Sequence, residues 1–106
     1  MEVSKQDWKL FREKLPRWQE DYMERLNREY IALLSEEGSA SYKFWKLSER
    51  IRHDKQSCGV VLRLSKQNMV WDIVAMINDD VISLDELDSF SEGLKDTVRY
   101  LCSRKL

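Results

Sequence analysis

The stretch WKLFREKLPRWQEDYMERLNREYIAL, residues 8–33, decides the fold of this 106-residue chain. Its large apolar residues recur at spacings of three and four, which places all of them on one face of a helix. Ser4 ahead of the stretch can cap the helix, and Gly38 behind it is a natural stop. The pattern predicts amphipathic helices over about 5–37. Their apolar face consists of Trp8, Phe11, Leu15, Trp18, Tyr22, Leu26, Tyr30 and Leu33.

Pro16 interrupts this stretch without shifting the phase of the apolar face. A proline inside a helix removes a hydrogen bond and costs ~3 kcal/mol, whereas a proline at the first helical position is tolerated. We therefore expect a short helix over about 5–14 to hand over to a second helix that starts at Pro16. The alternative is one long helix kinked at Pro16.

Downstream, the chain continues as amphipathic segments separated by short turns. Residues 41–54 form a predicted third helix, with helical spacing of its apolar residues. These buried residues are Phe44, Leu47 and Ile51. The segment 60–64 (VVLRL) is rich in β-branched residues yet long enough for a helical turn. Both a short strand and a helical turn stay open for this segment.

A fourth helix is expected over about 66–78, capped by Ser65. Its buried residues are predicted to be Met69, Val70, Ile73, Val74 and Ile77. The tetrapeptide from Ser83 to Glu86 has the capping-box pattern that starts a helix. The last apolar stripe follows it, and a break near Phe90 is allowed. That stripe consists of Leu84, Leu87, Leu94, Val98 and Leu101.

Together these segments predict an all-α fold, a compact bundle of four to six amphipathic helices. The length of 106 residues is typical of one domain. We expect a single helical domain over 1–106, with N-terminal helices over about 5–37 and a C-terminal helical subdomain over about 41–104.

Composition excludes several classes of protein. Hydrophobic residues make up 42% of the chain, which is too much for a disordered protein, and the net charge is −1, which is not that of a polyanion binder. No apolar run reaches the ~20 residues that span a bilayer, and no hydrophobic stretch follows the N-terminus as in a secretion signal. We expect a cytoplasmic protein that does not enter the membrane, with Cys58 and Cys102 as reduced thiols.

No arrangement of residues with catalytic chemistry stands out. His53 precedes Cys58 by five residues, so a nucleophilic pair can be drawn, but no glycine-rich turn accompanies the cysteine. Helical spacing places His53 on a polar face with Tyr42, Lys46 and Arg50, which indicates a solvated side chain. One His and two Cys lack a fourth zinc ligand, and no segment supplies the oxygens of a calcium loop. We expect no enzymatic activity, no cofactor and no metal; a pocket around His53 and Cys58 would revive a catalytic hypothesis.

Charge is distributed unevenly along the chain. Residues 39–67 carry seven Lys or Arg against two Asp or Glu, whereas 1–38 and 68–106 are net acidic. Basic residues interleaved with aromatics can contact phosphates and stack on bases, so 42–66 is a candidate nucleic-acid surface. We favour the competing hypothesis that the basic helix packs beside the acidic C-terminal third. The candidate nucleic-acid contacts are Lys43, Lys46, Arg50, Arg52, Arg63 and Lys66.

Several aromatic and apolar residues lie off the predicted core stripes. Trp71 projects opposite the buried face of its helix, either because that helix is covered on both sides or because Trp71 anchors a protein partner. The candidate interaction surface consists of Trp71, Tyr42, Trp45, Lys46, Arg50 and His53. A homodimer through the N-terminal helices is a further hypothesis. It would use Leu10, Met23, Ile31 and Leu34.

A set of short motifs is spread over residues 41–100. They are Phe44-Trp45, Arg50-Ile51, Asp54-Lys55, Gly59-Val60, Asn68-Met69, Asp72-Ile73, Leu87-Asp88-Ser89-Phe90-Ser91 and Leu94-Lys95. With these motifs the segment resembles a group of small uncharacterised proteins of Gram-positive bacteria, often carried with mobile elements. The resemblance implies a bacterial, intracellular accessory protein and assigns no chemistry.

From these observations we expect a non-enzymatic protein-interaction module, such as a mobile-element-encoded regulator or inhibitor of a host protein. The alternative is a nucleic-acid-associated regulator that uses the basic 42–66 stretch. The identity of the protein partner and the oligomeric state are left open by the sequence.

Overall fold

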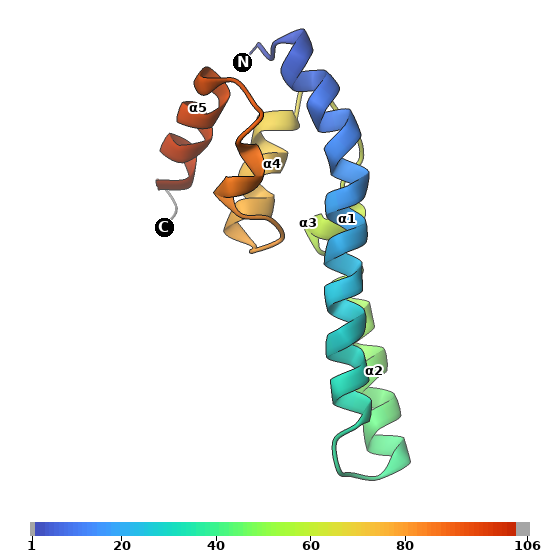
Figure 1. Cartoon of the computed structure of the whole chain (residues 1–106). Helices are drawn as coiled ribbons and strands as arrows, with labels where there is room; N and C mark the ends of the chain where they lie inside the picture. The colour runs from blue at the N-terminus through green and yellow to red at the C-terminus, as the bar shows by residue number, and fades with distance from the viewer. Residues whose placement is uncertain (1, 104–106) are drawn as a thin grey trace.

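The computed structural model describes residues 2–103 as helices joined by short turns (Figure 1). The elements are α1 (Lys5–Leu34), α2 (Ala40–Asp54), α3 (Cys58–Val61), α4 (Met69–Asn78), the 3-10 helix η1 (Leu84–Leu87) and α5 (Glu92–Ser103). No strand occurs in the described range, so the prediction of an all-α bundle is confirmed. The ends of the predicted 1–106 domain, including residue 104 of its C-terminal subdomain, lie outside the described residues.

Helix α1 runs without interruption through Pro16, so the predicted handover between two helices is wrong. Pro16 is exposed, and the buried residues on both sides of it, Leu15 and Trp18, pack into the same core. This packing outweighs the loss of one backbone hydrogen bond. The predicted cap is confirmed, because the Ser4 hydroxyl oxygen accepts a hydrogen bond of 3.0 Å from the Asp7 N–H.

The N-terminal half of α1 packs against α3, α4, η1 and α5, and we call this part of the molecule the body. Its core contains Phe11, Leu15 and Trp18 from the predicted apolar face of α1 and the buried sides of α4 and α5. Asp7 joins the first turn of α1 to the start of α5, since its carboxylate accepts hydrogen bonds from the Ser91 N–H (2.9 Å) and hydroxyl (2.6 Å). The core residues are Phe11, Leu15, Trp18, Met69, Val70, Ile73, Val74, Met76, Val81, Ile82, Leu87, Phe90, Leu94 and Val98.

Helix α4 begins at Met69, three residues later than predicted, because the Ser65 hydroxyl accepts from the Asn68 N–H and closes a turn instead of capping the helix. Met76 is fully buried, whereas Ile77, predicted to be buried, is only half-buried. Met69, Val70, Ile73 and Val74 are buried as predicted, so the predicted face is confirmed except at Ile77.

The capping box predicted at Ser83 does not form. The Ser83 side chain makes no cap hydrogen bond, and the Glu86 carboxylate instead accepts from the Trp18 indole N–H at 3.3 Å. Leu84, predicted to be buried, is exposed because η1 places it on the solvent side. The break near Phe90 is confirmed, and α5 starts at Glu92.

The ambiguous segment 60–64 contains no strand. Val60 and Val61 end the short helix α3, and 62–64 have no regular secondary structure. Gly59 in α3 lies so close to Tyr22 of α1 that a Cβ built on it would clash with the Tyr22 ring. A glycine at this position is what allows α3 to pack on α1.

Helix α2 runs antiparallel beside the C-terminal half of α1, and these segments with their connecting turn (residues 22–55) are the hairpin (Figure 1). The hairpin projects from the body and gives the molecule extents of 52 × 29 × 21 Å. Leu26 and Leu33 are buried within it but lie outside the core of the body. The hairpin thus has a small apolar seam of its own.

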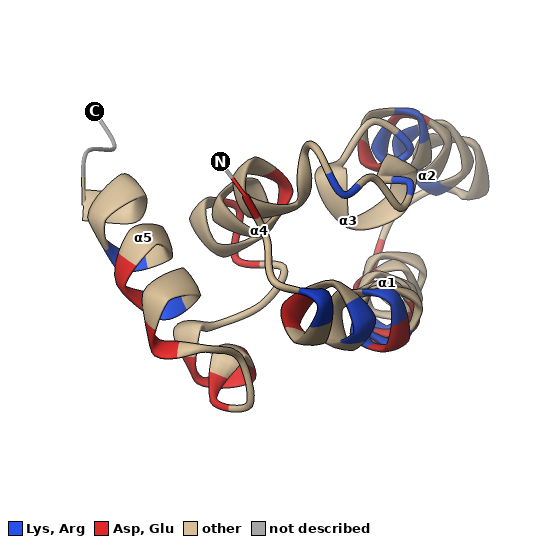
Figure 2. Cartoon of the chain, turned by 90° about the horizontal axis from the view of Figure 1, so that it is seen from above, with Lys and Arg blue, Asp and Glu red and all other residues tan. Residues whose placement is uncertain are grey.

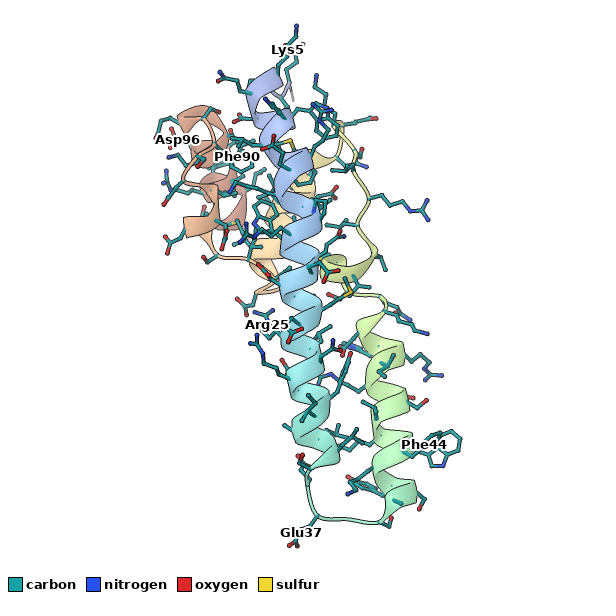
Figure 3. The ribbon with its side chains drawn as sticks, turned by 45° about the vertical axis from the view of Figure 1, so that its right-hand side comes forward. Lys5, Arg25, Glu37, Phe44, Phe90 and Asp96 are labelled. Atoms are coloured by element: carbon teal, nitrogen blue, oxygen red, sulfur yellow. The ribbon has the colours of Figure 1, made fainter. Side chains whose placement is uncertain are left out.

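Because α2 has one helix to pack against, it buries a narrow strip of its surface. Leu47 and Ile51 are half-buried as part of that strip. Phe44, predicted to be buried, is 62% exposed and projects from α2 into solvent (Figure 3). The aromatic residue was assigned to the core because the sequence pattern assumes a third helix on that side.

Candidate functional site

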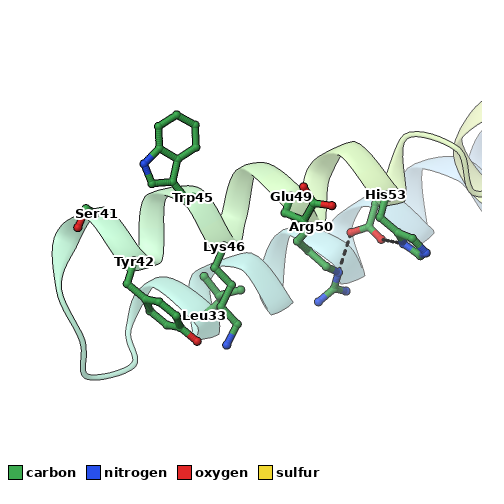
Figure 4. Close-up of a pocket in the computed structure, with 9 residues that line it drawn as sticks. Leu33, Ser41, Tyr42, Trp45, Lys46, Glu49, Arg50 and His53 are labelled. Carbon is green, nitrogen blue, oxygen red and sulfur yellow. Dashed lines mark hydrogen bonds and ion pairs between the residues drawn. The ribbon is translucent and has the colours of Figure 1, made fainter.

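An open, shallow groove of about 1100 Å³ runs along the hairpin (Figure 4). All but one of its residues come from α2, and Leu33 comes from α1. It is lined by Leu33, Ser41, Tyr42, Trp45, Lys46, Glu49, Arg50, His53 and Asp54. This volume exceeds that of most small-molecule sites, and an open groove suits a peptide or a protein segment better than a small molecule.

The helical repeat explains why these side chains share a face. Residues three and four positions apart lie above one another along a helix, and the lining residues of α2 follow that spacing from its first turn to its last. The start of α2 is fixed by Ser39, whose hydroxyl accepts a hydrogen bond of 3.2 Å from the Tyr42 N–H. This cap places Tyr42 at the open end of the groove.

Five of the six residues predicted as an interaction surface meet in this groove. They are Tyr42, Trp45, Lys46, Arg50 and His53. The sixth, Trp71, is 60% exposed, so α4 is not covered on that side, but Trp71 lies in the body and does not line the groove. Leu33 and Glu49 are not part of the interaction surface predicted from the sequence. For Glu49 a signal is present, because its position has helical spacing with Trp45, Lys46 and His53.

The groove carries exposed aromatic side chains that take no part in the core. Trp45 is 67% exposed and Tyr42 is 57% exposed. The ring of Phe44 meets that of Trp45 edge to face with centroids 5.0 Å apart, and the Lys46 ammonium lies 5.4 Å from the Tyr42 ring centroid. These contacts order the side chains locally while leaving most of their apolar surface open to a partner.

At the other end of the groove, a network built on Asp54 ties α2 to α1. Asp54 accepts a hydrogen bond of 2.6 Å from the Tyr30 hydroxyl and one of 2.9 Å from the Arg50 guanidinium. Arg50 also donates to Glu29 of α1. Arg50 therefore holds the hairpin together, and its charge is already neutralised by two carboxylates.

The ionisation of this network follows from burial and hydrogen bonding. Burial opposes the charge on Asp54, but hydrogen bonds from Tyr30 and His53 and the charge of Arg50 outweigh it, so the pKa of Asp54 lies below its usual value. Burial and the hydrogen bond to Asp54 together raise the pKa of Tyr30 to about 12. Asp54 is thus a charged acceptor and Tyr30 a neutral donor near pH 7.

His53 borders the groove with a largely solvated ring. Its side chain is 85% exposed, and Nδ1 lies 3.4 Å from the Asp54 carboxylate. The sequence prediction of a solvated histidine on the polar face of the helix is confirmed by this exposure.

Three basic residues of α2 are paired with carboxylates close to them. Lys46 pairs with Glu36, Arg50 with Glu29 and Asp54, and Arg52 with Glu49. Lys43 donates to the carbonyl oxygens of Leu34 and Glu36. The favoured hypothesis that the acidic C-terminal third neutralises this helix is wrong, since α1 and α2 supply these acceptors and α5 lies at the far side of the molecule (Figure 2).

The remaining two candidate nucleic-acid contacts, Arg63 and Lys66, lie apart from α2. Both are exposed in the segment between α3 and α4, and neither forms an ion pair within residues 2–103. The six predicted cations therefore do not form one continuous charged surface.

A second cavity, of about 540 Å³, brings His53 and Cys58 to the same site. It is lined by Tyr22, His53, Asp54, Gln56, Ser57, Cys58, Asp79 and Asp80. The Cys58 thiol donates a hydrogen bond of 3.4 Å to Asp79, and no hydrogen bond joins it to His53. Burial and the hydrogen bond to Asp79 raise the pKa of Cys58 to about 12. A thiol that is held protonated is a poor nucleophile, so this arrangement does not assemble a Cys–His pair.

Within residues 2–103, no group of three or more His, Cys, Asp or Glu side chains could hold a metal ion. None of the described helices combines the length and the apolar character that a membrane crossing requires. Comparison with protein-family models, with curated proteins and with solved structures found no match to this chain. The resemblance of residues 41–100 to small Gram-positive proteins stays a prediction.

Proposed function

We propose that this chain is a non-enzymatic protein-interaction module that binds its partner along the groove of the hairpin. The observation that carries the proposal is the exposure of Tyr42 and Trp45 on a concave face that serves no packing role in the body. Tyr and Trp are the residue types that dominate binding energy at protein interfaces, and they do so where a pocket shields them from water.

The chemistry of the groove indicates the kind of partner segment. Its lining combines the apolar side chain of Leu33 and the rings of Tyr42 and Trp45 with the polar side chains of Lys46 and His53. Lys46 is bound to Glu36 only through a long ion pair of 3.9 Å, so an incoming carboxylate can compete for it. We expect an amphipathic helix or extended segment with large apolar residues and flanking Asp or Glu.

The biological setting follows from the resemblance of residues 41–100. We infer a bacterial, cytoplasmic accessory protein encoded with a mobile element, acting as a regulator or inhibitor of a host protein. A projecting hairpin suits this role, since it can occupy a partner's surface while the body keeps its own core.

Affinity capture with matched aromatic variants tests the proposal. The full chain is immobilised, a partner is recovered from a Gram-positive lysate, and its affinity is then measured by calorimetry with the purified partner. Trp45→Ala and Tyr42→Ala are expected to weaken binding at least tenfold, as truncation of a hot-spot aromatic does. Tyr100→Ala, which removes a similarly exposed aromatic from α5, should bind as the parent does.

Two results would overturn the proposal. One is the absence of any stoichiometric partner, and the other is a partner whose affinity is unchanged by Trp45→Ala and Tyr42→Ala. Trp71→Ala is included because Trp71 is the alternative anchor, and loss of binding in this variant alone would move the interface to α4.

The nucleic-acid alternative has less support, because Lys46, Arg50 and Arg52 are already paired with carboxylates. It predicts binding to DNA or RNA that weakens steeply with salt as phosphate counterions are released. Unchanged mobility of both nucleic acids at low salt would exclude it.

A further inference from the structure

The hairpin has a second surface, on the side opposite its ion pairs. Glu29 and Glu36 lie on one flank of α1, where they pair with Arg50 and Lys46 on one flank of α2. These pairs fix which flanks of the two helices share a side. The other flanks must then share the opposite side, which we call the apolar side.

Helical spacing identifies the residues of the apolar side. On α1 it contains Ile31 and Leu34, which are 65% and 45% exposed and continue the helix flank that carries Met23 and Asn27. On α2 it contains Phe44, which is 62% exposed, next to the outer edges of Leu47 and Ile51, which are half-buried against α1. Leu10, the other residue predicted for self-association, packs against the core of the body and is not part of this side.

We propose that the apolar side of the hairpin is covered by the same side of a second copy, with the two hairpins antiparallel. Two helices that pack only against each other bury the apolar residues between them and leave those on their outer sides exposed. Two such pairs can bury these residues as well by packing together as a four-helix bundle. This proposal concerns a different side of the hairpin from the groove, and it does not rest on the proposed function.

Charge complementarity selects the second copy and its direction. Glu37 at the hairpin tip and Lys55 at the end of α2 form no ion pair within the described residues. The ion pairs between α1 and α2 show which residues of the two helices lie at the same level along the hairpin axis. Measured along this axis, Glu37 lies on the order of 10 Å from Ile31 toward the tip, and Lys55 lies on the order of 10 Å from Ile31 toward the body.

A two-fold axis at the level of Ile31 therefore brings Glu37 of each copy to the level of Lys55 of the other, so the Glu37–Lys55 contact forms twice. With parallel hairpins, the acidic tips would instead meet each other. The antiparallel arrangement also keeps the two bodies at opposite ends of the dimer.

The size of the apolar side sets the expected affinity. Two helices of about fifteen residues present a face of roughly 22 Å by 20 Å. With interdigitated side chains this is near the ~600 Å² per partner at which specific interfaces begin. A reversible dimer in the micromolar range is expected, whose affinity falls with salt because of the Glu37–Lys55 contacts.

Sedimentation velocity over a concentration series tests the proposal on the full chain. The parent is expected to shift from monomer to dimer, and Ile31→Glu and Phe44→Glu should each keep it monomeric, with far-UV circular dichroism confirming that both variants fold. Tyr42→Ala, which removes a groove residue without a ring contact to Phe44, should leave the dimer unchanged, and this separates the test of the dimer from that of the groove.

Charge reversal then tests the direction of the hairpins. Glu37→Lys and Lys55→Glu should each weaken the dimer by roughly tenfold, and the double variant should recover parental affinity. A parent that stays monomeric at all concentrations overturns the proposal. A dimer that survives Ile31→Glu and Phe44→Glu also overturns it, and failure of the double variant to recover overturns the antiparallel arrangement.

Discussion

At the scale of single residues, Asp54 decides how the hairpin is held. It is 6% exposed in an element that has one neighbour, and it accepts hydrogen bonds from α1 and α2 at once. Its partners were not predictable from the sequence, because Tyr30 and Arg50 had been assigned to the apolar stripe and to the polar surface. A signal was present, since a carboxylate four residues after an arginine on a helix often forms an ion pair.

We predict that Asp54→Asn lowers the free energy of unfolding by about 1–3 kcal/mol at pH 7, because it leaves the buried ends of Tyr30 and Arg50 poorly satisfied. The pKa of Asp54 is lowered by folding, so its contribution is present above the usual carboxyl pKa of ~3.9 and is lost as pH falls through the folded value. The difference between parent and variant should therefore narrow below about pH 4. Chemical denaturation from pH 3 to 7 measures this, with the exposed Asp96→Asn as control.

Cys58 provides a second prediction at this scale. In a Cys102→Ala background, alkylation of Cys58 at pH 8 should be at least about tenfold slower than that of a free cysteine peptide, because its pKa is raised to about 12. Asp79→Asn should accelerate the reaction, since it removes the charge that opposes the thiolate. Asp88→Asn should leave the rate unchanged, and a fast reaction in the parent would contradict the assignment.

At the scale of elements, α1 shows where local rules and tertiary packing disagree. The apolar face of α1 could be predicted because its spacing is set by the helix repeat, and the residues in it are buried or half-buried as expected. The continuity of α1 could not be predicted, because Pro16 by itself disfavours a continuous helix. What stabilises the helix there is the packing of Leu15 and Trp18 in the core of the body, which depends on tertiary structure. The same holds for η1, where Glu86 reaches Trp18 across the fold instead of capping its own turn.

Replacing Pro16 by Ala distinguishes one continuous helix α1 from two helices that meet at Pro16. In a continuous helix the variant regains a backbone hydrogen bond, so we expect the free energy of unfolding to rise by about 1–3 kcal/mol. At the first position of a separate helix, the same change would be neutral or destabilising. Thermal and denaturant unfolding of both proteins measure the difference.

Because α3 packs closely on α1, alanine substitutions at Gly59 and Gly93 should have different effects on stability. Gly59→Ala should destabilise the protein by about 1–3 kcal/mol, because the new methyl group meets the Tyr22 ring and the helices must separate. Gly93→Ala is the matched control, since its Cβ would have no neighbour within 4 Å. This variant should be as stable as the parent or up to about 1 kcal/mol more stable. Equal effects of the two substitutions would contradict the close approach at Gly59.

At the scale of the whole molecule, the sequence predicted the helical class but not the division into a body and a projecting hairpin. Helical periodicity reports which residues face a neighbour only if a neighbour is present on that side. Phe44 has the spacing of a core residue and yet is exposed, because α2 packs against a single helix. Residue type and spacing predicted five residues that line the groove. The distance of Trp71 from the groove could not be predicted, because it depends on tertiary structure.

In the proposed function, the aromatic residues of the groove, Tyr42 and Trp45, serve binding and not folding. The most direct test is the equilibrium unfolding free energy of the Tyr42→Ser/Trp45→Ser double variant, measured at low protein concentration beside Trp18→Ala. We predict a loss of no more than about 1 kcal/mol for the double variant, as for exposed sites, and of about 3–5 kcal/mol for Trp18→Ala, which removes a core aromatic. A loss in the double variant as large as that of Trp18→Ala would show that these rings belong to the fold and would contradict the claim.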